Sequence, residues 1–338
     1  MSFAGRAARS VVGLLAALLS CAKPPVYEEP VTDGRYVMGT ILEVTLPADS
    51  PRAAFDELFD TARKLDAQLS SYSETSDVSR LNRSAGGAPT PVAGPVREIL
   101  ELSVDYSRRT GGAFDVTIGP LVELWMQAGD RGRVPTQAEI EVAKSRVGSE
   151  KIRVSADGTV RLEEPGMSIN LGGIAKGYAL DRMLPLLLAR GVESALLSFG
   201  QSSTWALGAP SGAPGWRLLV RGTTGDFVGL ITLRDQALSV SESLGQWVEI
   251  EGRRFGHVVD PRTGQPLIRE RQALVVAPTA ALAEALSKLM LVADAADGLA
   301  LVAAQPGCDG LLIEAGGQLS ATPGWADSAR FELFSDSP

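Results

Sequence analysis

Hydrophobic positions recur with helical spacing in several segments of the chain. In residues 52–69 the apolar side chains return every three or four positions, as an amphipathic helix requires. The same spacing predicts further helices over residues 96–106, 135–147, 174–190, 280–292 and 297–304. Pro185 lies inside one of them, where its missing N–H predicts a break or a kink.

Other segments alternate between apolar and polar positions, which is typical of strands. One strand is predicted over residues 36–46, and a hairpin joins 151–155 to 159–163 around Asp157-Gly158. Further strands are predicted over residues 194–199, 204–207, 216–221, 228–233, 247–250, 254–259 and 311–314. Strand pairs outnumber strand–helix–strand units. The sequence therefore predicts an α+β fold with antiparallel or mixed sheets flanked by helices.

The first residues read as an export signal. Arg6 and Arg9 precede an apolar stretch that is too short to span a bilayer. Residues 18–21, Leu-Leu-Ser-Cys, resemble the lipobox of bacterial lipoproteins, in which the Cys is acylated. We therefore expect residues 1–20 to be a lipoprotein signal peptide and residues 21–34 to be a Pro-rich tether. Residues 35–338 would form one exported domain, anchored to a membrane through Cys21 and facing the periplasm. A plain signal peptide that ends in Cys is the alternative.

Composition narrows the possible chemistry. The chain has 338 residues, of which 45% are hydrophobic and 21% charged, so it is expected to be globular. A net charge of −8 argues against DNA or RNA as a partner. The chain has one His and two Cys, which excludes zinc sites built from several such residues and bis-His haem. A bound metal would need oxygen ligands. With Cys21 lipidated, Cys308 would be alone, and we expect it to be a buried thiol.

Two Gly-rich segments carry candidate binding chemistry. Residues 110–117 read TGGAFDVT, where two glycines allow a ligand to approach the backbone. Residues 170–181 read NLGGIAKGYALD and place Lys176 in the first turn of a helix, as in a phosphate-binding site. Both segments also have structural interpretations. The first could be a helix end, and the second a tight turn with a solvated Lys176.

Two further segments carry ionisable side chains. Residues 256–264, GHVVDPRTG, place His257 before a turn, where it could act as an acid or base. A lone His is also commonly structural. Residues 283–288, AEALSK, place Glu284 and Lys288 four residues apart on a helix, which could be an ordinary surface ion pair. The chain contains no P-loop, Rossmann, zinc-protease or serine-hydrolase motif.

In this order and spacing, the four segments resemble the ApbE family of FAD:protein FMN transferases. Met38-Gly39-Thr40, residues 69–72 and residues 79–82 extend the resemblance to roughly residues 35–320. The resemblance implies an α+β fold that holds a flavin between the Gly-rich segments. It also implies transfer of FMN from FAD to a Thr or Ser hydroxyl of an exported flavoprotein, with release of AMP.

The resemblance also assigns roles to individual residues. It implies that His257 helps to activate the acceptor hydroxyl. It implies that Mg²⁺ lies near the pyrophosphate, at the Gly173 carbonyl, Glu284 and Ser287. The residues implied to line the FAD site are Met38, Tyr72, Ala113, Phe114, Asp115, Asn170, Lys176 and Val258.

The chain departs from the family pattern around the metal. The family sequence Ala-Asp-Ala-Leu-Ser-Thr has Glu284 in place of Asp and Lys288 in place of Thr. A charged Lys cannot ligate a metal, because it has no free lone pair. We therefore form the hypothesis that the Lys288 ammonium stands where Mg²⁺ would sit. The alternatives to a transferase are an FAD-binding lipoprotein with little activity and an FAD pyrophosphatase.

Overall fold

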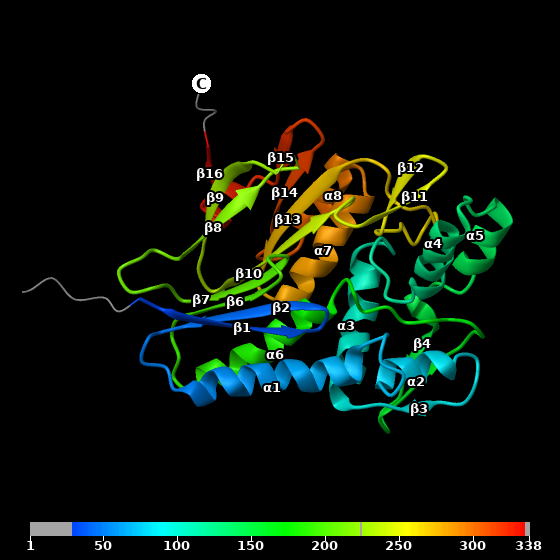
Figure 1. The fold of residues 1–338 in the computed structure, drawn as a ribbon, viewed down its shortest axis with the longest axis horizontal. Helices are drawn as coiled ribbons and strands as arrows, with labels where there is room; N and C mark the ends of the chain where they lie inside the picture. The colour runs from blue at the N-terminus through cyan, green and yellow to red at the C-terminus, as the bar shows by residue number, and fades with distance from the viewer. Residues whose placement is uncertain (1–28, 224, 335–338) are drawn as a thin grey trace, which may run out of the picture.

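The computed structural model describes residues 29–223 and 225–334, and its centre is an eight-stranded sheet. The strand order is β1-β2-β6-β7-β10-β13-β14-β15, and every neighbouring pair is antiparallel (Figure 1). This confirms the predicted α+β class. The strands are β1 (Val31–Val37), β2 (Thr40–Leu46), β6 (Ala195–Phe199), β7 (Ser203–Leu207), β10 (Gln236–Glu242), β13 (Arg271–Ala277), β14 (Asp309–Glu314) and β15 (Leu319–Ala321).

Three small antiparallel sheets surround the large one. The predicted hairpin of residues 151–163 is present as β4 and β5, and the predicted pairing after residue 247 is present as β11 and β12. β12 ends at Gly256, whereas the strand was predicted to continue to residue 259, so Val258 lies in the loop that follows. The small sheets consist of β3 (Thr90–Pro91), β5 (Thr159–Leu162) and β4 (Ile152–Val154), of β16 (Glu332–Leu333), β9 (Phe227–Leu233) and β8 (Trp216–Arg221), and of β11 (Trp247–Ile250) and β12 (Arg253–Gly256).

Every predicted helix is present. Of the break or kink predicted at Pro185, the break is wrong, because α6 continues past it to Ala189 while packing against both α1 and α7. No helix in residues 29–223 or 225–334 has the length and apolar character needed to cross a membrane. The helices are α1 (Arg52–Leu69), α2 (Asp77–Arg83), α3 (Gly94–Arg109), α4 (Gly119–Arg131), α5 (Gln137–Lys144), α6 (Ala175–Ala189), α7 (Ala280–Val292), α8 (Ala295–Ala303) and α9 (Trp325–Ser328), with a 3₁₀ turn at Ser149–Lys151.

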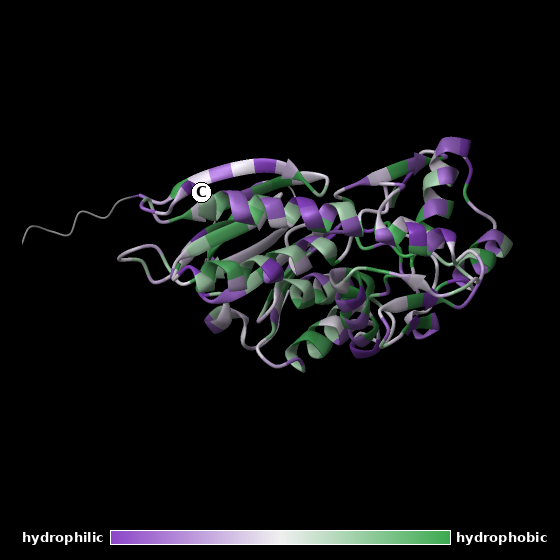
Figure 2. Cartoon of the chain, turned by 90° about the horizontal axis from the view of Figure 1, so that it is seen from below, coloured by the Kyte–Doolittle hydropathy of each residue, from purple (hydrophilic) through white to green (hydrophobic). Residues whose placement is uncertain are grey.

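The large sheet has a hydrophobic core on each face. In β13, Ala273 and Val275 pack into the cluster that includes α6 and α7, while Leu274 and Val276 pack into the cluster with β8 and β9. Because both faces are covered, every residue of β13 is buried. Figure 2 shows hydrophilic and hydrophobic residues mixed along the outer helices, as expected for elements with one buried side. Cys308 is a buried free thiol, as predicted, and burial raises its pKa to about 11.

The start of the domain differs from the prediction. The single strand expected over residues 36–46 is a hairpin, because Met38 and Gly39 both adopt positive φ and reverse the chain. Its first strand begins at Val31, so residues 31–34 belong to the sheet rather than to the tether. The predicted signal peptide and Cys21 lie outside the described residues.

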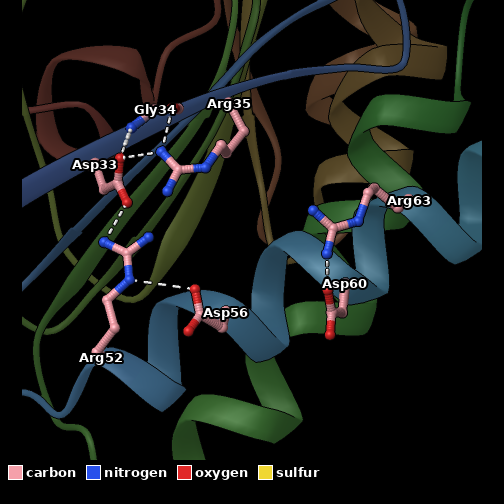
Figure 3. Close-up of polar contacts among 7 residues, drawn as sticks. All are labelled: Asp33, Gly34, Arg35, Arg52, Asp56, Asp60 and Arg63. Carbon is pink, nitrogen blue, oxygen red and sulfur yellow. Dashed lines mark hydrogen bonds and ion pairs between the residues drawn. The ribbon is translucent and has the colours of Figure 1, made fainter.

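An ion-pair network joins this first strand to α1 (Figure 3). Asp33 contacts Arg35 and Arg52, each at 2.5 Å, and accepts the Gly34 N–H at 2.8 Å. Burial would raise the pKa of Asp33, but hydrogen bonds from Arg52, Gly34 and Arg35 outweigh it and hold that pKa below its usual value. The network therefore ties residues 33–35 of β1 to the start of α1.

The helices α6 and α7 meet at a glycine. A Cβ at Gly177 would lie 2.5 Å from the backbone of Ala280, so only Gly allows this approach. One turn later, the Asp181 carboxylate accepts the N–H groups of Ala280 and Ala281, at 2.7 and 2.9 Å. Asp181 thus caps α7, although burial raises its pKa to about 6. These contacts fix the position of α6 relative to α7.

We expect Gly177→Ala to lower the free energy of unfolding by about 2 kcal/mol, because the added methyl group overpacks the helix contact. Gly298→Ala in α8 is the matched control, since its Cβ would have its nearest neighbour at 3.4 Å, an ordinary contact. It should raise the free energy of unfolding by about 0.5–1 kcal/mol through helix propensity. Urea denaturation measures both values. Equal effects of the two substitutions would contradict the close contact.

Candidate active site

The loop after α3 is organised around the Asp115 carboxylate. Its Oδ1 accepts hydrogen bonds from the Thr117 N–H and hydroxyl, at 2.8 and 2.6 Å. Its Oδ2 accepts from the Ser149 N–H at 2.8 Å and from the Ser107 hydroxyl at 3.2 Å. Asp115 is buried, and its two oxygens are occupied by donors of the protein itself. It therefore positions the loop and does not present a free acceptor to a ligand.

The two Gly-rich segments lie side by side. The Asn170 N–H donates to the Val116 carbonyl at 2.7 Å, and Asn170 Oδ1 accepts the Gly172 N–H at 2.9 Å. A Cβ at Gly173 would lie 3.5 Å from the Phe114 ring. The segment that leads into α6 is thus held against the loop of residues 110–117. The half-buried Lys176 follows in the first turn of the helix.

The fourth segment reaches the same place from α7. The Lys288 side chain passes beside Gly173, where a Cβ would lie 3.8 Å from its Cε. Its Nζ donates to the Ser241 hydroxyl of β10 at 2.7 Å. Glu284 is buried, with Oε1 accepting from the Ser203 hydroxyl and Oε2 lacking a hydrogen-bond partner. The Glu284–Lys288 spacing is therefore not an ordinary surface ion pair.

His257 presents one ring nitrogen for chemistry. Its Nδ1 lies 3.0 Å from the Gln246 carbonyl oxygen, which can only accept. Nδ1 must therefore carry the proton, and Nε2 of the neutral ring is left as an acceptor. The residue is exposed, but the protein atoms around the ring still disfavour its charged form. This desolvation, together with Lys288 and Lys176, lowers the pKa of His257, while Glu242 opposes the shift.

Three of the segments therefore form one electrostatic cluster. The charges of Lys288 and Lys176 lower the pKa of His257, and the charge of Glu242 raises it. Burial lowers the pKa of Lys288 to about 8, with Glu284 opposing the shift and Lys176 adding to it. At neutral pH the cluster still holds two cations beside a neutral His, at the N-terminus of α6. This arrangement can bind a phosphorylated ligand and accept a proton from it or from a partner.

The remaining predicted residues differ in burial and in local contacts. Ala113 is buried, and Val258 is half-buried against the main core. Met38 lies in the β1–β2 turn, where its N–H donates to Asp66 at 3.1 Å. Tyr72 is 90% exposed, and its described hydrogen bond is a backbone contact to the Ser70 hydroxyl. The contribution of Tyr72 to the FAD site therefore stays a prediction.

Sequence reasoning missed the roles of the serines. Ser239 and Ser241 lie on one face of β10, and both hydroxyls contact the Ser287 hydroxyl, at 3.1 and 2.7 Å. Ser203 on β7 donates to Glu284. The signal that could have found them is a pair of serines at alternate positions in an otherwise apolar segment, which places two hydroxyls on one buried face.

The residues at the implied metal position do not fit Mg²⁺. Ser287 donates its hydroxyl proton to the Glu284 carbonyl at 2.8 Å, so its two lone pairs accept from Ser239 and Ser241. The Lys288 methylene groups pass beside Gly173, and its ammonium, held by the Ser241 hydroxyl, would repel a divalent cation nearby. Across the described residues, no group of three or more His, Cys, Asp or Glu side chains could hold a metal.

We expect Asp115→Ala to lower the free energy of unfolding by about 3 kcal/mol or more, because it leaves several buried donors unpaired. Asp157→Ala is the matched control. Asp157 accepts the same two donors from Thr159, at 3.0 and 2.7 Å, but on an exposed hairpin. Water replaces the lost acceptor there, so the control should lose less than about 1 kcal/mol. Urea denaturation compares the two. Losses of similar size would rule out an organising role for Asp115.

Comparison with known proteins agrees with this geometry. The ApbE family model matches residues 38–321. An FAD:protein FMN transferase of Treponema pallidum is 30% identical over 316 residues, with 87% of each chain covered. That of Escherichia coli K12 is 30% identical over 276 residues, with 78% of each chain covered.

Solved structures show the same fold. The ApbE protein of Thermotoga maritima aligns with a TM-score of 0.81 and 26% identity, covering 89% of this chain and all of that one. The flavinyl transferase ApbE of Pseudomonas stutzeri aligns with a TM-score of 0.77 and 26% identity, covering 90% and 98% of the two chains. The family match spans most of the domain, and it includes all four segments that form or support the cluster. This chain belongs to the ApbE family.

Proposed function

We propose that this protein is an FAD:protein FMN transferase. It moves FMN from FAD to the hydroxyl of a Thr or Ser in an exported flavoprotein and releases AMP. The observation that carries the proposal is His257, whose free Nε2 lies in one cluster with Lys176 and Lys288 at the start of α6. The family membership and the names of the relatives support it.

The proposed reaction uses these groups in a single displacement. The acceptor hydroxyl oxygen forms a bond to the FMN phosphorus, and the bond from that phosphorus to the bridging oxygen breaks. The bridging oxygen leaves with AMP and keeps the bonding electron pair. His257 Nε2 takes the hydroxyl proton, and the cations offset the charge that develops on the phosphate oxygens. Catalysis of this kind depends on positioning and charge rather than on covalent intermediates.

The neighbouring segments would hold the FAD molecule. Phe114 and Asn170 flank the backbone of residues 172–173, which leads into the N-terminus of α6. Asp115 would act indirectly, by keeping that loop in place through its four donors. Tyr72 would meet the flavin or the acceptor protein with its exposed side chain.

We expect His257→Asn to slow flavinylation roughly 10²–10⁴-fold, because the variant lacks the general base. FAD affinity should be unchanged, which serves as the control for folding and binding. The assay uses FAD, an acceptor domain with a known target Thr, and in-gel flavin fluorescence in single turnover. A variant that retains the wild-type rate would remove His257 from the mechanism.

The same assay predicts a pH profile. The base must be neutral, and its folded pKa is lowered below 6.5, so protonation should inhibit only at acidic pH. The rate should rise as pH increases through that lowered pKa and reach a plateau before neutrality. His257→Asn should lose this dependence. Release of AMP and free FMN without covalent flavin would instead indicate FAD hydrolysis.

We also propose that the protein is exported and lipid-anchored at Cys21, facing the periplasm. The support is the basic, apolar and Leu-Leu-Ser-Cys pattern of residues 6–21. In a bacterial host, the wild type should label with a fatty-acid probe and sediment with membranes. Cys21→Ser should lose the label and appear in the soluble fraction. Unlabelled wild-type protein in the soluble periplasm would favour a plain signal peptide.

A further inference from the structure

The position implied for a divalent metal contains a fixed ammonium group. Lys288 Nζ is tied to Ser241 at 2.7 Å, and its side chain passes beside the Gly173 backbone. An ammonium has three N–H donors, and Ser241 takes one of them. Within residues 29–223 and 225–334, no second hydrogen-bond partner competes for the other two. They are available to an anionic ligand.

A chain of hydroxyl groups fixes the ammonium in place. Lys288 can only donate, so it donates to Ser241. Ser241 then donates to Ser287, and Ser287 donates to the Glu284 carbonyl. Ser239 supplies the second hydrogen bond to Ser287. Every hydroxyl in this chain has its partners, so the position of Nζ is set before a ligand arrives.

Glu284 supplies the balancing negative charge. Its side chain is 2% exposed and carries one oxygen without a hydrogen-bond partner. Its charge favours the protonated form of Lys288 one helical turn away. Within the described residues no hydrogen bond or ion pair joins Glu284 to Lys288. The carboxylate therefore does not occupy the two remaining N–H donors of the ammonium. Lys176 adds another positive charge to the same region.

We propose that the Lys288 ammonium takes the place of a divalent cation on the pyrophosphate of FAD, so that this protein binds and cleaves FAD without Mg²⁺. The inference rests on the proposed function. Lys288 contributes one positive charge and up to two hydrogen bonds to the phosphate oxygens. As AMP leaves, these contacts offset the charge on its phosphate, while the proton goes to His257 as described above. No metal takes part in this balance.

FAD affinity, measured by quenching of flavin fluorescence, tests the proposal without relying on turnover. Wild-type protein should bind FAD equally well in excess EDTA and in Mg²⁺. Lys288→Met should weaken binding in EDTA roughly 10- to 100-fold, the effect expected for loss of charged hydrogen bonds to phosphate. Lys288→Arg should retain most of the affinity, because it keeps the charge. Lys64→Met is the matched control, since Lys64 is exposed on α1, and its affinity should not change.

Several outcomes would overturn the inference. Tighter FAD binding by the wild type in Mg²⁺ than in EDTA would show that a metal is required. Equal affinities of wild type and Lys288→Met would show that the ammonium does not contact FAD. Thermal unfolding of Lys288→Met checks that the variant folds, as expected when an apolar chain replaces a buried charge.

The same experiments separate this inference from the proposed function. Metal-independent FAD binding that depends on Lys288, without transfer to any acceptor, would contradict the transferase and leave the role of Lys288 in place. Covalent flavinylation that occurs only with Mg²⁺ would support the transferase and reject the Lys288 proposal. Restoring the family residues with Glu284→Asp and Lys288→Thr together should create a response of FAD binding to Mg²⁺.

Discussion

The junction of α6 and α7 is the constraint on which the site depends. Gly177 lets the backbones approach, and Asp181 then caps α7 with a carboxylate that comes from α6. This fixes the first turn of one helix against the second helix. Lys176 on α6 and Lys288 on α7 consequently face the same ligand region, although 112 positions separate them in the chain. Two cations would not remain close without such an external restraint, because their mutual repulsion opposes it.

The site brings two ammonium groups together inside an acidic protein, with Glu242 and Glu284 beside them. The net charge of −8 gives no hint of this, because the positive groups are few and lie close together. Their effect comes from partial burial, which removes the water that would screen them. The same burial lowers the pKa of His257 and Lys288. One environment thus keeps a base neutral and strengthens the attraction of an ammonium for phosphate. These are the two properties that phosphoryl transfer to a hydroxyl requires.

Local patterns predicted the outer elements of the fold better than its centre. The helix over residues 52–69 and the strand over 216–221 were found because each has one buried face and one exposed face. The central strands β10 and β13 were missed. β13 is covered on both sides, so RQALVVA shows no alternation that distinguishes it from a short buried helix. The hairpin at Met38 was missed because its turn uses positive φ at a residue that rarely adopts it.

For the site, the sequence identified individual residues better than the contacts between them. His257, Lys176 and Lys288 were identified as residues, but their grouping depends on contacts between segments distant in the chain. The alternating serines of β10 were a weak signal, because a hydroxyl in a strand is equally compatible with solvent and with a buried network. Asp115 was assigned to the ligand, whereas its four donors come from the protein.

The substitution of Lys for Thr at position 288 would be damaging in isolation. A buried ammonium without partners costs several kcal/mol, and the group would lose its proton or leave the site. Here Ser241 accepts one of its hydrogen bonds and Glu284 lies one helical turn away, so the charge is stabilised in place. The hydroxyls of Ser239, Ser241 and Ser287 bond to one another, to Lys288 and to the Glu284 carbonyl, so they are poor ligands for a metal. The charged form of Lys288 therefore depends on side chains of β10 and α7 that surround it, and not on the replacement of Thr alone.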